Sequence, residues 1–550
     1  MSHRLRDLSV ASCVALAFAV LLTWPLAARI GSAGRIDSGD GRHGVWNVAW
    51  VAHTLTTHPA SLFDANIFYP HPQTLAYSEA NIVAGLLAVP VWVTTGNPYA
   101  SFNTVVLLAF AGAALAGFLL VRVLGGSRLG ATLAGLTYGF APYTFSHIPH
   151  IQLLMTCGPA LSMAAMHHFT KAPSWRRGAA LGGALAVTGL ACAYYGIFAA
   201  LIVAVGLLWS AIGERRLKDR RFWIGIGVAV LVVVVVVGPF FVPYLDVRRA
   251  GFDRTLADAA LFSTDGSAYV VSPSLIHGWM LPLVGEWRGV LFPGFLAVFL
   301  AGVAVVVATR SRTALSRGTV GLYVTVGLLA FWASFGPDAG LYALLYHVVP
   351  GFSFLRTPVR FGMIVTLCAA VLGGLAVTWL QQRRWKAGPW LAAAMLVVAV
   401  AESYVGPLRL ADAPELNNAY RRLAIMPRAP VAEFPFFQGA VDRHRQTEYM
   451  LMSTFHWQPL INGYSDHVPA GYSEDAPRLA TFPSTDAWEV LRAREVRWVV
   501  VHFNSYPPEV SPALRAQLLK MTDRLRIVVD EEVSLYEVIW PTPPNVLSRR

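Results

Sequence analysis

Charged side chains are scarce in this chain of 550 residues: 13% of them are Asp, Glu, Lys or Arg, whereas 55% of the residues are hydrophobic. A soluble protein of this length would carry far more charge on its surface. The apolar residues are grouped in repeated runs of about 18 or more, the length that a helix needs to cross the hydrocarbon core of a bilayer. The low charge therefore excludes a soluble enzyme and predicts a mainly α-helical, polytopic membrane protein.

Cysteine is also rare, and the four cysteines do not form a site. Cys13, Cys157, Cys192 and Cys368 all lie in apolar segments, and none has the spacing of a metal-binding motif. We expect them to be small apolar packing residues.

Basic residues exceed acidic ones, which gives a formal net charge of +12. They do not form a patch with interleaved aromatic residues, so the excess does not indicate nucleic-acid binding. Instead they occur in short clusters between apolar runs, as in membrane proteins whose cytoplasmic loops are basic.

The apolar runs predict about eleven membrane helices. The first run, residues 8–30, is too long for the apolar region of a cleaved signal peptide. The basic clusters recur on alternate connections, which places the N-terminus in the cytoplasm and the C-terminal region outside it. The expected spans are residues 8–30, 99–121, 129–145, 151–169, 178–193, 195–212, 222–244, 289–309, 318–335, 359–380 and 389–404.

The first outer loop, residues 31–97, contains a short apolar segment at residues 81–95 that Pro90 interrupts. If this segment crossed the membrane, every later basic cluster would fall on the outer side. We therefore expect an interfacial helix within the loop. Residues 1–406 would then form one transmembrane domain.

Polar residues and prolines return in residues 407–550. Segments rich in β-branched and aromatic residues predict strands at residues 431–437, 496–503, 527–530 and 534–539. A helix is expected from Asp486 to Arg494, with Glu489 completing a capping box, and another after Ser511. This region should form an α/β domain outside the cytoplasm.

Titratable residues gather at the outer boundary, above all between Arg35 and Trp50, a stretch that contains Asp37, Asp40 and His43. A carboxylate at this position can take a proton from an acceptor hydroxyl, so Asp40 or Asp37 is a candidate general base. The two carboxylates could also hold a divalent metal ion, Mg²⁺ or Mn²⁺. A simpler interpretation, which stays open, is that they cap the helix that follows.

Two arginines, Arg356 and Arg360, stand four residues apart at the start of the span at residues 359–380. Guanidinium groups suit bidentate contact with phosphate, so the pair is a candidate site for a donor phosphate, although it could equally anchor the helix among lipid headgroups. Further candidates for acceptor binding or an auxiliary role lie in the outer loops: Asp64, Glu79, His147, His150 and Glu286.

These residues belong to motifs spread over nearly the whole chain. The motifs are Asp37-Ser-Gly-Asp40-Gly with Trp46 and Trp50, Phe68-Tyr69-Pro70, Ser146-His147 with His150 and Gln152, Tyr194-Tyr195, Glu286 before Leu291-Phe292-Pro293-Gly294, Leu355 to Phe361, and Tyr449 with His456-Trp457 and Asn462-Gly463-Tyr464. In them the chain resembles the bacterial, mannosyltransferase-like polytopic membrane glycosyltransferases of the GT-C superfamily, which use polyprenyl-phosphate-linked sugars.

The resemblance implies an enzyme of the bacterial inner membrane that moves a hexose or pentose from a polyprenyl-phosphate donor to a glycan, lipid or protein acceptor outside the cytoplasm. It also implies that an Asp of the first outer loop is essential. Two alternatives remain: a lipid or glycan transporter or flippase, and an inactive GT-C scaffold in envelope assembly. Transporters often carry repeats and ionisable residues within the membrane, and neither is evident in this sequence.

Overall fold

The computed structural model describes residues 3–37, 39–249, 251, 254–285, 289–311, 315–383 and 386–540. The chain divides into two compact units, each made of separate segments. The first, which we call the helical unit, comprises Met1–Arg35, Asn81–Ala88 and Phe102–Ala411. The second, the mixed unit, comprises Ile36–Ala80, Val89–Ser101 and Asp412–Arg550.

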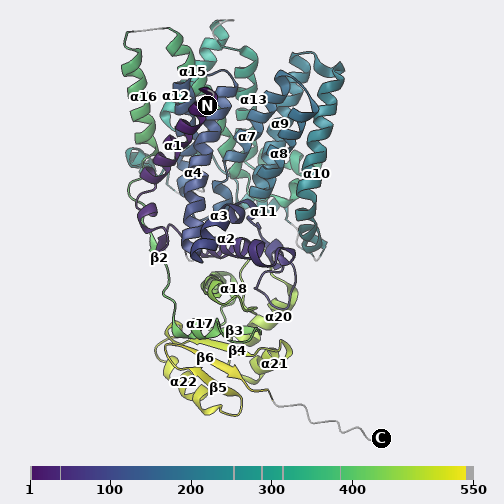
Figure 1. The fold of residues 1–550 in the computed structure, drawn as a ribbon, viewed down its shortest axis with the longest axis vertical. Coiled ribbons are helices and arrows are strands. Elements are labelled where there is room, and N and C mark those ends of the chain that lie inside the picture. Colours follow the sequence, from purple (N-terminus) through teal and green to yellow (C-terminus); the bar gives the residue numbers. More distant parts are fainter. Residues whose placement is uncertain are drawn as a thin grey trace. The chain divides into compact units, whose positions relative to one another are not determined.

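The helical unit consists of helices that lie side by side (Figure 1). The helices are α1 (His3–Leu22), α4 (Pro98–Val123), α5 (Arg128–Gly139), α6 (Pro142–Ser146), α7 (Cys157–Lys171), α8 (Trp175–Ala191), α9 (Ala193–Gly213), α10 (Arg220–Arg249), α11 (Leu256–Leu261), α12 (Phe295–Arg310), α13 (Arg317–Ser334), α14 (Leu341–Val348), α15 (Gly362–Gln382) and α16 (Gly388–Ser403). The first residues of α4 belong to the mixed unit, and α3 (Ile82–Thr95) is shared between the two.

Helix α15 is the central helix of this unit, since it contacts α5, α12 and α13 and most of its residues are buried. Close approach to α5 depends on glycine: a Cβ atom on Gly130 would lie 2.2 Å from the carbonyl oxygen of Gly374. Small residues at such crossings let helix backbones come into contact, which is how helices associate within membranes.

The predicted spans all contain helices, but their lengths differ from the prediction. Among the described residues, four helices are long and apolar enough to cross a membrane: α4, α9, α10 and the helical segment Pro358–Gln382. The number of described helices that are long and apolar enough to cross a membrane therefore differs from the eleven predicted. One reason is visible at residues 129–145, where Ala141 takes an extended conformation before Pro142 and separates α5 from α6.

The surface of α10 shows that the chain is a membrane protein. Val230, Leu231, Val234 and Val235 are each more than half exposed, in a helix of 30 residues with a mean hydropathy of 2.8 over its most apolar window. A contiguous apolar surface of this kind is stable against lipid and not against water.

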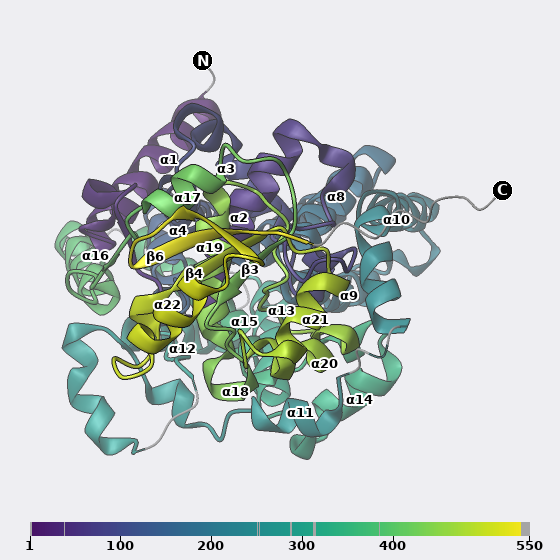
Figure 2. The ribbon, with the colours of Figure 1, turned by 90° about the horizontal axis from the view of Figure 1, so that it is seen from below.

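The mixed unit is built on a four-stranded sheet with the strand order β3-β4-β6-β5. Figure 2 shows β3, β4 and β6 of this sheet from below. The strands are β3 (Val431–Phe434), β4 (Trp498–His502), β5 (Leu525–Val529) and β6 (Val533–Val538), which confirms the four predicted strands. β3 pairs in parallel with β4, whereas β6 is antiparallel to both β4 and β5. Outside this sheet, β1 (Ala33–Gly34) of the helical unit pairs with β2 (Ala411–Asp412), whose first residue is the last of that unit.

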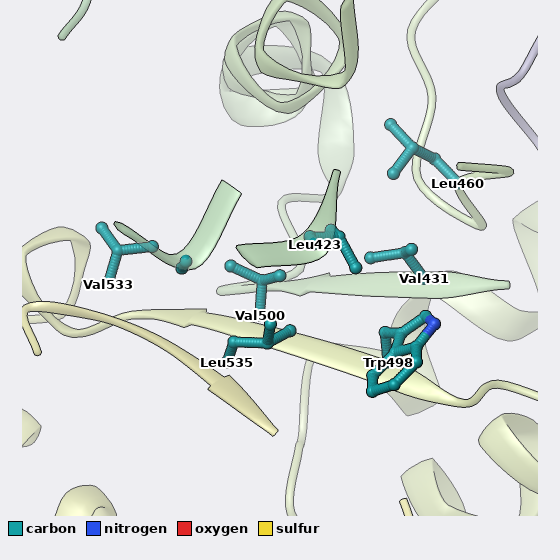
Figure 3. Close-up of a cluster of buried hydrophobic side chains, with 8 residues drawn as sticks. Leu423, Val431, Leu460, Trp498, Val500, Val533 and Leu535 are labelled. Atoms are coloured by element: carbon teal, nitrogen blue, oxygen red, sulfur yellow. The ribbon is translucent and has the colours of Figure 1, made fainter. Parts of the chain in front are cut away.

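One face of this sheet holds a cluster of buried apolar side chains. The helices of the unit are α2 (Asp40–Thr57), α17 (Asn418–Leu423), α18 (Gly439–Asp442), α19 (Gln446–Met452), α20 (Ala470–Leu479), α21 (Thr485–Ala493) and α22 (Ser511–Lys520). Figure 3 shows the core side chains, which alternate along β4 and β6 because successive residues of a strand point to opposite faces. They are Leu423, Val431, Leu460, Trp498, Val500, Val533 and Leu535.

Backbone hydrogen bonds join the first loop to the C-terminal region within the mixed unit. The amide of Phe68 donates to the carbonyl of Asn462 at 3.0 Å, and the amide of Tyr69 donates to that of Leu460 at 2.8 Å. The amide of Leu460 donates back to Asn66 at 3.0 Å. The first loop is therefore an integral part of the α/β unit.

Candidate active site

In the mixed unit, the predicted first-loop aspartates lie at the start of α2. The Oδ1 atom of Asp37 accepts hydrogen bonds from the amides of Gly39 at 3.1 Å and Gly41 at 2.7 Å. Amides of a first helical turn have no partner within the helix, so a carboxylate that accepts from them stabilises the helix start. The capping interpretation therefore describes Asp37 in this structure.

The chain turns tightly at this point. A Cβ atom on Gly41 would lie 2.8 Å from the Cβ of Ile36, so a larger residue would displace the turn. The glycine lets the Asp37 carboxylate approach the helix end closely.

Asp40 is exposed and meets a different partner. Its Oδ1 atom accepts a hydrogen bond from the hydroxyl of Tyr464 at 3.1 Å. Burial raises the pKa of Tyr464 and the Asp40 carboxylate raises it further, so the phenol stays protonated and remains a donor. This hydrogen bond fixes the orientation of an exposed carboxylate.

His43 lies one turn along α2 from Asp40, with its ring 6.1 Å from that of Tyr464. Burial lowers the pKa of His43, against the opposing effect of the carboxylates of Asp40 and Asp466. The imidazole is therefore neutral at physiological pH. We call Asp40, His43, Tyr464 and Asp466 the first-loop cluster.

Two other predicted acidic residues have local contacts in the loop. The exposed Asp64 accepts a hydrogen bond from the amide of Gln73 at 2.9 Å. The half-buried Glu79 receives, through its backbone carbonyl, a hydrogen bond from the Asn47 side chain at 3.1 Å. Both contacts shape the loop, and an acceptor-binding role for either residue stays a prediction.

Over the described part of the chain, no group of three or more His, Cys, Asp and Glu side chains is arranged to hold a metal ion. Asp37 and Asp40 thus do not gain a third ligand of these types, and the divalent metal stays a prediction. Glu286 lies outside the described residues.

In the helical unit, Tyr194 contacts both predicted arginines. Its hydroxyl accepts a hydrogen bond from the amide of Arg356 at 3.1 Å, and the guanidinium of Arg360 lies 4.2 Å from its ring centroid. Arg360 lies in a short 3-10 turn, Pro358–Phe361, directly before α15, whereas Arg356 lies in the preceding loop. The Arg356 guanidinium instead lies 5.2 Å from the ring centroid of Phe262, so Tyr194 holds the backbone of Arg356 and the side chain of Arg360.

The predicted histidines belong to the same part of the helical unit. Burial lowers the pKa of His147 to about 3; the hydrogen bond to the Tyr143 carbonyl opposes this shift, and the charge of Arg360 adds to it. The Nδ1 atom of His147 lies 2.8 Å from that carbonyl, which can only accept, so Nδ1 carries the proton and Nε2 is the basic nitrogen. The His150 ring lies 6.0 Å away.

Tyr143 joins these residues into a network. Its ring stacks on that of His147 at 4.2 Å, and its hydroxyl lies 2.9 Å from the hydroxyl of Tyr195. We call Tyr143, His147, His150, Tyr194 and Arg360 the histidine–arginine cluster. It combines the Arg360 guanidinium with the neutral His147 and with tyrosine hydroxyls, an arrangement suited to an anionic group such as phosphate.

Sequence reasoning missed two members of these clusters. Tyr143 precedes His147 by four residues, a spacing that places both on one helical face and could have indicated the pair. Asp466 follows Tyr464 by two residues, and no local pattern connects either to Asp40.

Trp46 and Trp50 of the first-loop motif are core residues of the mixed unit, although tryptophans at a membrane boundary are often interfacial. They are 1% and 6% exposed, and their indole N–H groups donate to Asn66 at 3.2 Å and to the Leu62 carbonyl at 2.9 Å. Burial of both rings excludes a direct contact with lipid or sugar in this conformation.

Comparison with known proteins gives structural matches only. No family model and no curated protein matches the sequence. The arabinofuranosyltransferase AftD from mycobacteria has a similar structure, with a TM-score of 0.61 and 15% identity over 98% of this chain and 40% of AftD. The chain thus spans about two fifths of the length of AftD, and the match shows that it shares the fold of that part of AftD.

Weaker matches include two other membrane enzymes. The oligosaccharyltransferase of Archaeoglobus fulgidus matches with a TM-score of 0.47 and 13% identity, over 91% of this chain and 69% of that one. ArnT from Cupriavidus metallidurans, bound to undecaprenyl phosphate, matches with a TM-score of 0.46 and 14% identity, over 96% of this chain and 97% of ArnT.

Proposed function

We propose that this chain, which has the fold of GT-C glycosyltransferases, transfers a sugar from a polyprenyl-phosphate donor to a glycan, lipid or protein acceptor outside the cytoplasm. The observation that carries the proposal is the structural similarity to AftD over 98% of the chain. AftD is named for a reaction of this class, the transfer of an arabinofuranosyl group. The N-terminus would be cytoplasmic and the mixed unit outside, in the inner membrane of a bacterium.

In this reaction the acceptor oxygen attacks the anomeric carbon of the sugar while the bond from that carbon to the phosphate oxygen breaks. The electron pair of the broken bond leaves with the polyprenyl phosphate, and the acceptor hydroxyl loses its proton to a base. We assign the role of base to Asp40, because it is exposed and because Tyr464 fixes one of its oxygens. Asp37 is the weaker candidate because two amides occupy its Oδ1.

We assign binding of the donor phosphate to Arg356 and Arg360. Support comes from the guanidinium of Arg360 held against Tyr194 and from the neutral His147 beside it. Fixed cations stabilise the charge that grows on the leaving phosphate. Asp64, Glu79, His150 and Glu286 remain candidates for acceptor binding or auxiliary roles.

The test is an assay of sugar transfer by the purified full-length chain in lipid nanodiscs. Polyprenyl-phosphate arabinofuranose and polyprenyl-phosphate mannose serve as donors, with glycan, glycolipid and peptide acceptors. Removal of a general base costs about 100-fold or more in kcat, so Asp40→Asn should lose at least that much while Asp37→Asn retains most activity. An increased KM for donor in Arg360→Gln would support the phosphate role.

Equal turnover by the wild type and Asp40→Asn would remove Asp40 as the base. Movement of the lipid-linked sugar across proteoliposomes without any new bond would favour the transporter alternative. If neither activity occurs with any donor, the result would favour the scaffold.

A further inference from the structure

Helices α1, α4 and α5 leave a groove of about 610 Å³ between them in the helical unit. The groove lies at the end where α1 and α5 begin, whereas the histidine–arginine cluster follows the end of α6. Its walls are apolar and include Val10, Ala11 and Phe118. Its volume is in the range of sites that bind small molecules.

The wall formed by α4 and α5 is rigid because these helices are in backbone contact. A Cβ atom on Gly135 would lie 2.5 Å from the carbonyl oxygen of Ala114, and one on Gly139 would lie 2.5 Å from the Ala114 amide nitrogen. On the opposite wall, α1 presents the small side chains of Ala11 and Ala15 to the groove. The space between is therefore built into the packing.

The polar lining of the groove carries a positive charge. Arg128 is paired with Asp7, with Nη2 2.8 Å from Oδ1 and Nε 3.0 Å from Oδ2. The Arg128 side chain is still 68% exposed, so it keeps donors for a further anion. Arg6 is exposed and adds a second cation to the same lining.

We propose that this groove binds an anionic phospholipid from the leaflet around the start of α1. Its acyl chain would lie against Val10 and Phe118, and its phosphate would contact Arg6 and Arg128. Basic pockets between membrane helices are suited to anionic lipid headgroups. A zwitterionic lipid has the same chains and the same phosphate but lacks the net charge that complements the two arginines. The site does not depend on the proposed transfer reaction.

The experiment uses the purified full-length chain in detergent, titrated with phosphatidylglycerol or phosphatidylcholine of identical acyl chains and analysed by native mass spectrometry. Arg6→Gln removes one cation of the groove. Ala11→Phe fills the groove and keeps every charge. Arg176→Gln is the matched control, because Arg176 is also an exposed arginine near the start of a helix, α8, and does not line the groove.

The expected result is preferential binding of phosphatidylglycerol by the wild type and by Arg176→Gln. One surface cation contributes about 1 kcal/mol to binding of an anionic membrane lipid, so Arg6→Gln should weaken the affinity about fivefold. Ala11→Phe should reduce binding of both lipids.

Equal affinity for the two lipids in the wild type would overturn the proposal, as would the same loss in Arg6→Gln and Arg176→Gln. If Ala11→Phe does not fold, as judged by its thermal unfolding, the comparison of the two arginine variants decides alone.

Discussion

The Oδ1 atom of Asp37 accepts hydrogen bonds from two backbone amides, whereas the Oδ1 atom of Asp40 accepts one from a phenol. The first contact fixes the helix start, and its oxygen is no longer available to an acceptor hydroxyl. The second contact leaves the carboxylate at the exposed surface. At the scale of single residues, the two aspartates therefore have separable roles that substitution can distinguish.

Asp37 should act through the helix cap rather than through its charge. Replacement of a capping side chain by alanine costs about 1 kcal/mol, so Asp37→Ala should lower the thermal unfolding temperature of the detergent-solubilised chain. Asp37→Asn keeps an oxygen that can accept from Gly39 and Gly41 and should unfold close to the wild type. If Asp37→Asn instead loses transfer activity at unchanged stability, the charge of Asp37 takes part in the reaction.

Tyr464 should tune the basicity of Asp40. A hydrogen bond to a carboxylate favours its charged form, so Tyr464→Phe removes that bond and should raise the pKa of Asp40. The acidic limb of the pH–rate profile for sugar transfer should then move to higher pH by about half a unit or more. Tyr77→Phe, whose lost hydroxyl donates only to the Pro72 carbonyl, is the control. An unmoved acidic limb would show that Asp40 does not set it.

At the scale of helices, Glu402 near the end of α16 connects that helix to the start of α12. Its Oε1 atom accepts from the amides of Phe295 at 2.8 Å and Leu296 at 3.3 Å, and the side chain is 7% exposed. His277 lies beside it, with Nε2 3.6 Å from the same oxygen. The first amides of a helix have no partner within the helix, and Glu402 supplies the acceptor here.

Glu402→Ala should destabilise the helical unit. Partly buried amides left without an acceptor cost up to about 1–3 kcal/mol, whereas Glu402→Gln keeps a side-chain oxygen and should lose less. The melting temperatures of the two variants in detergent measure these losses. The control is Glu214→Ala, which removes an exposed carboxylate after α9 and should leave the melting temperature unchanged. A melting temperature of Glu402→Ala equal to that of the wild type would contradict the capping role.

The elements that sequence predicted best are those whose signal is local. β4 and β6 follow runs of β-branched residues, and α10 follows one long apolar run. Boundaries that depend on side-chain contacts were less accurate. The helix predicted to begin with a capping box at Asp486 is capped by Ser484, whose hydroxyl accepts from the amide of Ala487 at 3.2 Å. Both residues are good caps, so composition could not choose between them.

For the candidate site, too, the sequence predicted residues but not their contacts. Asp40, His147 and Arg360 became candidates because they are titratable or charged residues at the ends of apolar runs. Their partners could not be predicted, because the hydrogen bond from Tyr464 to Asp40 joins residues 424 positions apart. Such a contact depends on the folded chain, and a single sequence without that fold does not contain it.

At the scale of the whole molecule, the stability of the mixed unit should depend on pH through His456. Burial lowers its pKa to about 3, and its Nδ1 accepts a hydrogen bond from the amide of Gln458 at 3.0 Å, which protonation would break. In the unfolded chain the ordinary pKa is 6.5. The unfolded state therefore binds more protons between these values, and this contribution to stability is lost as the pH falls from about 6.5 to about 3.

Each pH unit between the two pKa values changes the contribution of His456 to the free energy of unfolding by about 1.4 kcal/mol. Between pH 7 and pH 4.5 that contribution should therefore fall by about 2–3 kcal/mol. The buried Glu433 acts in the opposite direction because burial raises its pKa. The readout is therefore the difference between the wild type and His456→Phe in thermal unfolding at the two pH values. His456→Phe should lose less stability on acidification. Equal losses would show that His456 is not the titrating group.

The first loop and the C-terminal region should also open together, because the amides of Phe68 and Tyr69 donate to the carbonyls of Asn462 and Leu460 within the mixed unit. In hydrogen exchange of the full-length chain, a peptide that covers residues 66–70 should exchange as slowly as one from β4, since both are opened only by unfolding of the unit. The same peptide measured in denaturant, where the unit is unfolded, gives the fast reference. Deletion of residues 408–550 removes both carbonyl acceptors, so the peptide at residues 66–70 should then exchange as fast as that reference. If the peptide at residues 66–70 stays protected after the deletion, the first loop holds its structure without the C-terminal region. A loss of activity in the truncated chain would then be due to the C-terminal residues themselves.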